Sequence, residues 1–170
     1  MARVVFIHND QDAASRELLA QLQAAHPTQV EVLDFMAVRS QLWFRGCPAV
    51  WLLPTGSAGY DAPAWKGEVD VVTADVDAAL PAARVIHLAT DATTINRTGG
   101  AAPNQAAITA ALTDLDGNPA AMDGVTFLAG GQVVQAPDGV LQFSSATAGT
   151  FTVSCQHPTA ADAQIQVVVQ

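Results

Sequence analysis

The chain has 170 residues, half of them hydrophobic, with 16 acidic against 7 basic residues and a formal net charge of −9. It is long enough to bury one core or two small ones. The acidic excess occurs in both halves, so a phosphate backbone or an anionic membrane surface would repel the chain. We therefore expect neither a nucleic-acid partner nor a membrane partner, and no run of residues approaches the ~20 apolar residues that a membrane-spanning helix needs.

The first residues, MARVVFIHND, enter a strand-like apolar run at once and have none of the features of a secretory signal. We expect synthesis in the cytoplasm without a signal peptide. The two cysteines, Cys47 and Cys155, lie in different halves and do not have metal-ligand spacing, so neither a disulfide framework nor a zinc site is predicted.

Residues 1–80 show an alternation of strands and helices. The continuous apolar run 3–8 predicts a strand of a parallel sheet, and residues 15–25 have leucines at helical spacing after a cluster of capping residues at 9–12. A second strand is predicted at 30–35, a short helix at 36–44 and a third strand at 49–54. Beyond a long Gly/Pro-rich loop at 54–63, we expect a strand at 66–72 and a helix at 73–80 capped by Thr73.

Residues 46–50, Gly-Cys-Pro-Ala-Val, open the third strand. Together with the order of elements, this motif resembles the thioredoxin/glutaredoxin fold over residues 1–80. The resemblance implies a cis peptide bond at Pro48, facing the start of the first helix. The Cys-x-x-Cys motif of that family is missing, because residues 12–15 are Asp-Ala-Ala-Ser, so dithiol exchange is not expected.

Cys47 and the aromatic residues after it are the candidate binding residues of this half. Cys47 is either a lone reactive thiol or a small half-buried side chain, and we favour the second interpretation because Asp10 and Asp12 disfavour a thiolate. Tyr60 and Trp65 flank the end of the long loop, where exposed aromatic side chains could anchor a partner. We expect Cys47, Pro48, Tyr60 and Trp65 to form a contact surface.

From residue 84 onward the chain contains short runs rich in Val, Ile, Thr and Phe, separated by Gly, Asp-Gly or Pro turn signals, which is typical of an antiparallel β-sandwich. A run of motifs here resembles the bacterial Ig-like domains of the invasin/intimin type. They are the strand 108–112, the turn DLDGNP at 114–119, the strand VTF at 125–127, an Asp-Gly hairpin at 138–139 and GTFTV at 149–153. The predicted fold class is thus an α/β thioredoxin-like domain over 1–80, a junction at 81–83 and an all-β Ig-like sandwich over 84–170.

Two further patterns suggest chemistry but have simpler explanations. Asp114, Asp116 and Asn118 alternate like calcium ligands, yet an EF-hand loop needs Gly at its sixth position and Glu at its twelfth, and both are missing. His8 ends the first strand, where ligands of α/β sheets gather, although a hydrogen-bonded structural histidine is the simpler interpretation. We predict no metal, no cofactor and no catalytic residue.

These features favour a non-enzymatic structural or binding module. Ig-like modules of this kind decorate phage tails and capsids, so we expect a phage or prophage protein, associated with the virion or tail, that presents an Ig-like domain. Its partners would be other protein subunits of the assembly, or cell-surface carbohydrate or protein bound by the Ig-like domain. The alternative is an atypical thioredoxin-like redox or peptide-binding protein that uses Cys47.

Overall fold

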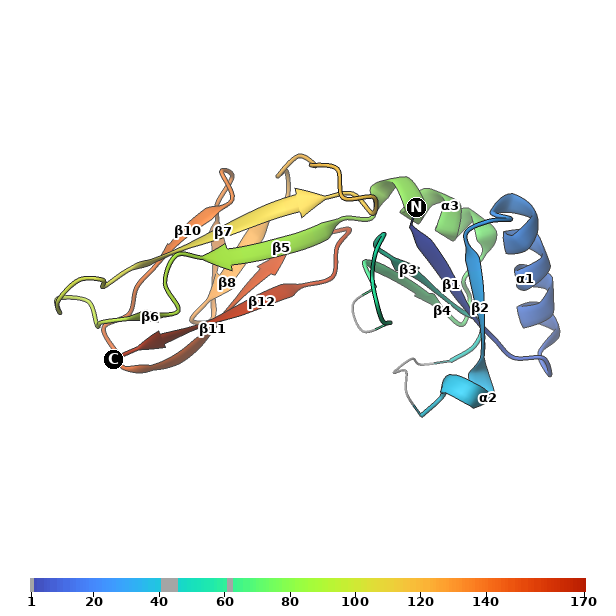
Figure 1. Ribbon diagram of the computed structural model, residues 1–170, viewed down its shortest axis with the longest axis horizontal. Helices are drawn as coiled ribbons and strands as arrows, with labels where there is room; N and C mark the ends of the chain where they lie inside the picture. Colours follow the sequence, from blue (N-terminus) through green and yellow to red (C-terminus); the bar gives the residue numbers. More distant parts are fainter. Residues whose placement is uncertain (1, 41–45, 61–62) are drawn as a thin grey trace. The chain divides into compact units, whose positions relative to one another are not determined.

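The computed structural model describes residues 2–40, 46–60 and 63–170. Its strands form three sheets, and the chain divides into two compact units (Figure 1). The first unit contains Met1–Val85 and the turn Asp114–Asn118, and the second contains Ile86–Thr113 and Pro119–Gln170. The molecule is therefore a mostly-β protein with three sheets.

The first unit has one four-stranded sheet, of order β2-β1-β3-β4. Its elements are β1 (Arg3–His8), α1 (Ala13–Ala25), β2 (Val30–Asp34), α2 (Phe35–Val38), β3 (Ala49–Leu53), β4 (Trp65–Glu68) and α3 (Thr73–Ala82). β1 runs parallel to β2 and antiparallel to β3, and β3 runs antiparallel to β4. The apolar run at the N-terminus is buried on both faces because β1 and β3 are the two central strands.

The two faces of this sheet have different covers. On one face, Leu18 and Leu22 of α1 and Val76 of α3 pack against β1 and β3. On the other face, the side chains of β1 and β3 meet α2 and Tyr60. Since α2 has four residues, the described part of the chain covers this second face with one helical turn and loop residues rather than with a layer of helices.

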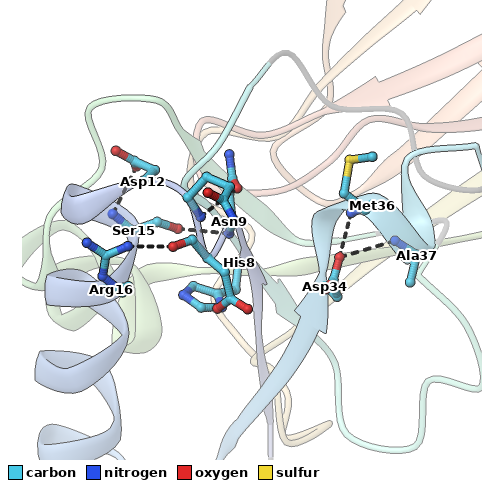
Figure 2. A network of polar contacts seen from close by, with 10 residues as sticks. His8, Asn9, Asp12, Ser15, Arg16, Asp34, Met36 and Ala37 are labelled. Carbon is cyan, nitrogen blue, oxygen red and sulfur yellow. Dashed lines mark hydrogen bonds and ion pairs between the residues drawn. The ribbon is translucent and has the colours of Figure 1, made fainter.

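Side-chain caps explain where α1 and α2 begin (Figure 2). The Asp12 carboxylate accepts a hydrogen bond from the Ser15 amide at 2.9 Å, and the buried Ser15 hydroxyl accepts one from the Asn9 amide at 3.1 Å. In the same way, Asp34 accepts a bond from the Met36 amide at 2.6 Å and starts α2 directly after β2. The capping cluster predicted at 9–12 is therefore confirmed.

The second unit is built from eight strands in two sheets. They are β5 (Val85–Thr90), β6 (Thr94–Ile95), β7 (Ala106–Thr113), β8 (Thr126–Ala129), β9 (Gln132–Gln135), β10 (Val140–Phe143), β11 (Gly149–Gln156) and β12 (Ala163–Val169). One sheet has the order β10-β7-β5 and the other β6-β12-β11-β8-β9. Ile108, Phe127 and Val153 belong to a single buried cluster shared by both sheets, so the unit is a β-sandwich around one core.

The expected assignment to a thioredoxin-like α/β domain joined to an invasin-type Ig-like domain is wrong. Strands dominate the described residues, and the helices are confined to α1, α2 and α3. The helix predicted at 36–44 is the single turn α2, and residues 41–44 of that prediction lie outside the described residues. Three sheets with so little helix fit an all-β protein better than an α/β one.

Three local predictions also differ from the structure. Asp138-Gly139 does not make a hairpin, because β9 pairs with β8 whereas β10 pairs with β7, so this turn passes between the two sheets. β4 begins at Trp65 and ends at Glu68, before the predicted end at 72. The cap of α3 is Val72 rather than Thr73, and the Asp75 carboxylate accepts a hydrogen bond from the Val72 amide at 2.9 Å.

Candidate functional site

A groove lies beside α1 in the first unit. Its cavity of about 360 Å³ is lined by one side of α1 and by Pro48 and the segment 69–72. Leu18 and Val71 add apolar side chains to its lining, while Glu17 and Asp70 add acidic groups. We call this feature the α1 groove. Its two carboxylates disfavour anionic ligands and suit an uncharged or basic one.

One wall of the α1 groove is held in an unusual backbone conformation. Val69 has a φ of 67°, and the Asp70 amide donates a hydrogen bond to the Glu68 carbonyl at 2.9 Å. This is the geometry of a γ-turn with positive φ, which is rare and strained for a β-branched residue. The Val69 amide donates to the Pro48 carbonyl at 2.9 Å, and about half of the side chain is exposed. Strain of this kind often marks functional positions.

Pro48 lines the α1 groove, and Cys47 precedes it in the chain. The Cys47–Pro48 peptide bond is cis, as predicted from the motif at 46–50. The thiol of Cys47 is partly buried against the α2 side of the sheet. Burial raises the pKa of this thiol, and the charges of Asp12 and Glu68 raise it further. A thiolate is therefore disfavoured at neutral pH, which is the opposite of what a reactive cysteine requires.

Tyr60 is engaged in a polar cluster within the first unit. Its hydroxyl donates a hydrogen bond to a Glu31 carboxylate oxygen at 2.6 Å, and the Arg3 guanidinium carbon lies 5.2 Å from the centre of its ring. Arg3 also donates through Nε to the other Glu31 oxygen at 3.0 Å. The hydrogen bond to Glu31 raises the pKa of Tyr60. Tyr60 thus ties the loop to β1 and β2.

Trp65 lies on the opposite face of the sheet from Tyr60. It pairs with Leu52 and is partly buried against the cluster covered by α1 and α3. A Cβ atom placed on Gly67 would come within 2.4 Å of the Trp65 ring, so the ring lies directly over this glycine. The structure therefore brings Cys47 and Tyr60 to one face of the sheet and Trp65 to the other.

The candidate metal and histidine residues have structural contacts. The Asp114 carboxylate accepts hydrogen bonds from the amides of Asp116 and Asn118, each at 2.9 Å, and from the Asn118 side chain. The bonds to Asn118 lower the pKa of Asp114, and these interactions close the turn. His8 Nδ1 lies 3.2 Å from an Asp10 carboxylate oxygen.

Sequence reasoning overlooked a surface of the second unit that has almost no charge. Of the 7 basic and 16 acidic residues in the chain, this unit contains Asp91, Arg97, Asp123, Asp138 and Asp162. Globular domains usually have ~25% charged residues. Comparing the charge of the two halves did not find this signal, whereas counting charged residues within the predicted strands of the second half would have found it.

The low charge is most evident on the outer face of the five-stranded sheet. Directly paired residues point to the same side of a sheet, and Phe127, Val153 and Val167 point into the core. The residues between them point outward, and all of them are uncharged: Thr94, Thr126, Leu128, Val133, Gln135, Thr150, Thr152, Ser154, Gln156, Gln164, Gln166 and Val168. We call this surface the Thr/Gln face.

The class of protein that the fold and these sites define is a mostly-β protein with a charge-poor sandwich. No family model, curated protein or solved structure matches the chain. The described residues contain no group of three or more metal-ligating side chains. Among the helices in that part of the chain, none has the length and apolar character to cross a bilayer.

The chemistry expected of Cys47 can be measured by alkylation. In a Cys155→Ala variant, which leaves Cys47 as the remaining thiol, we expect the reaction rate with iodoacetamide to rise with pH around a midpoint above the reference value of ~8.5. At pH 7 the reaction should be slower than that of a cysteine in an unstructured peptide, because burial and nearby acids oppose the thiolate. A Cys47→Ser/Cys155→Ala variant measures the background. A midpoint below the reference value would contradict this prediction.

Proposed function

We propose that this chain is a non-enzymatic structural or binding module that works as a subunit of a larger protein assembly. The Thr/Gln face is the observation that carries the proposal. An uncharged sheet face of Thr, Gln and Val side chains on a chain of net charge −9 suits contact with another uncharged protein surface.

The sandwich supports a role in presenting surfaces rather than in chemistry. Both of its sheets contribute to one apolar core, an arrangement compatible with an Ig-like sandwich. The inward positions of its long strands are committed to this core, as in β7, where buried and more exposed residues alternate. Specificity in such a unit comes from faces, loops and strand edges.

We place this module in a phage or prophage particle, as a virion or tail-associated subunit whose partners are other protein subunits. Copies of such a subunit are packed at high local density, and charge-poor faces reduce the repulsion that a net charge of −9 would otherwise cause. The alternative redox function through Cys47 is disfavoured, because burial and the nearby acids Asp12 and Glu68 raise the thiol pKa.

Particles released by prophage induction of the source strain test this proposal. Antibodies against the purified chain should label the particles in electron micrographs, and the chain should co-sediment with them through a density gradient. Lysates of an uninduced culture serve as the control. If the chain stays at the top of the gradient and the particles are unlabelled, the proposed location is wrong.

A further inference from the structure

β9 forms one edge of the five-stranded sheet, with β8 as its neighbour on the other side. A two-residue turn, Gly130-Gly131, joins the two strands, and both glycines have positive φ, at 57° and 79°. These angles are typical of the type I′ turn that closes tight hairpins. The orientation of the β9 backbone follows from this turn.

In such a hairpin, the residues flanking the turn form a hydrogen-bonded pair, and bonded and non-bonded pairs then alternate. The flanking pair here is Ala129–Gln132, so the ladder bonds to β8 fall on Gln132 and Val134. The N–H and C=O groups of Val133 and Gln135 therefore point away from β8, toward the open edge.

This edge has none of the usual features that prevent strands from pairing with other chains. Natural edge strands are commonly protected by charged side chains, proline or a bulge. The four residues of β9 are Gln-Val-Val-Gln, in regular register with β8. The Val133 side chain is 65% exposed and lies beside Leu128 on the Thr/Gln face.

We propose that β9 pairs antiparallel with β9 of a second copy of this chain, which joins two five-stranded sheets into one continuous sheet. The inference rests on the proposed function as an assembly subunit, and it identifies the partner as another copy.

The register of this pairing is determined by the outward backbone groups. A two-fold axis through Val134 and perpendicular to the sheet sets Val133 opposite Gln135 of the second copy, and the reverse. Each of these two pairs exchanges two N–H···O bonds, so all the outward groups of β9 are satisfied. Val133 and Gln135 point to the same face, which keeps both Thr/Gln faces on one side. Pro137, the next outward position, has no N–H and ends the ladder.

Charge determines where a second copy can approach. Two chains of net charge −9 repel each other, so they approach best where neither presents a charge, and β9 and the Thr/Gln face meet this condition. In this register the two outward residues of one β9 meet the two outward residues of the other, so the edge is complementary to itself, as a two-fold contact requires. Because the strand is short, the pairing should be weak and should depend on concentration.

Sedimentation equilibrium of the full chain tests the proposal. We expect a monomer–dimer equilibrium that shifts toward dimer between about 10 µM and 1 mM, in the range of weak, small interfaces. Val133→Lys should raise the dissociation constant at least tenfold by bringing two like charges to the new interface. Thr152→Lys, which adds the same charge to the same face on the interior strand β11, should change the constant by less than twofold.

Hydrogen exchange of the wild-type chain gives a second measurement that needs no variant. The amides of Val133 and Gln135 should exchange fast at low concentration and become protected at high concentration, while those of Gln132 and Val134 are protected throughout. A chain that stays monomeric at 1 mM, or a Val133→Lys variant that dimerises like Thr152→Lys, would overturn the inference. If particles are labelled by antibody but the purified chain is monomeric, the proposed function survives and the β9 pairing does not.

Discussion

Phe127→Ala is expected to destabilise the second unit by about 3–5 kcal/mol, the usual cost of removing a fully buried aromatic side chain. Phe127 is 0% exposed and sits on β8, opposite Cys155 of β11 and Val134 of β9. Its ring belongs to the cluster that both sheets share, so the cavity left by alanine would lie in the middle of the sandwich. The thermal transition of this unit should shift downward by many degrees.

The positions of the tryptophans allow the two units to be followed separately. All three Trp residues of the sequence fall within Met1–Val85, so Trp fluorescence reports on the first unit, whereas circular dichroism reports on both. Phe127→Ala should shift the dichroism transition and leave the fluorescence transition in place. Phe6→Ala, at a fully buried position of β1, is the matched control and should shift the fluorescence transition. Equal shifts of both signals in Phe127→Ala would mean that the units unfold as one.

Gly139→Ala is the second substitution with a large expected effect, a loss of about 2–4 kcal/mol. Gly139 has a φ of 74°, which costs an alanine ~1–2 kcal/mol. The added methyl group would also lie 2.9 Å from the Ala110 carbonyl oxygen and 2.7 Å from the end of Met122. The carbonyl belongs to the backbone and cannot move cheaply, since the Ala110 amide already donates to the Gly139 carbonyl at 2.8 Å.

Gly99→Ala separates the cost of the positive φ from the cost of the close contacts. Gly99 has a similar φ of 88°, but a methyl group there would meet no atom within 4 Å. Chemical denaturation of both variants should show the smaller loss for Gly99→Ala, and the difference measures the contact with Ala110. Equal losses would show that backbone conformation alone requires the glycine at 139.

Local sequence patterns were sufficient to predict the helices and strands that are determined by interactions between neighbouring residues. The run of apolar residues at 3–8 was expected to be a strand of a parallel sheet. β1 has these bounds, and it runs parallel to β2 but antiparallel to β3. The helix after it was expected from its leucines and from its capping residues, and Asp12 does cap α1. In both cases the deciding interactions lie within a few residues of one another.

The candidate site depended on contacts between distant segments. Tyr60 and Trp65 are five positions apart, but they lie on opposite faces of the sheet because β4 pairs with β3 only from Trp65 onward. Val69 was expected inside a strand, whereas its bond to the Pro48 carbonyl holds it in a γ-turn beside the α1 groove. The pattern of alternating residues could not reveal either effect.

The turns show most clearly which features the local sequence determines and which the tertiary structure determines. By itself, the sequence determined that the chain turns at Gly130-Gly131 and at Asp138-Gly139, because glycine accepts positive φ at both places. Only the tertiary structure decided that the first turn closes a hairpin and the second leads from one sheet to the other. The choice of partner strand depends on which apolar faces bury one another in the shared core, and that is a property of residues far apart in the chain.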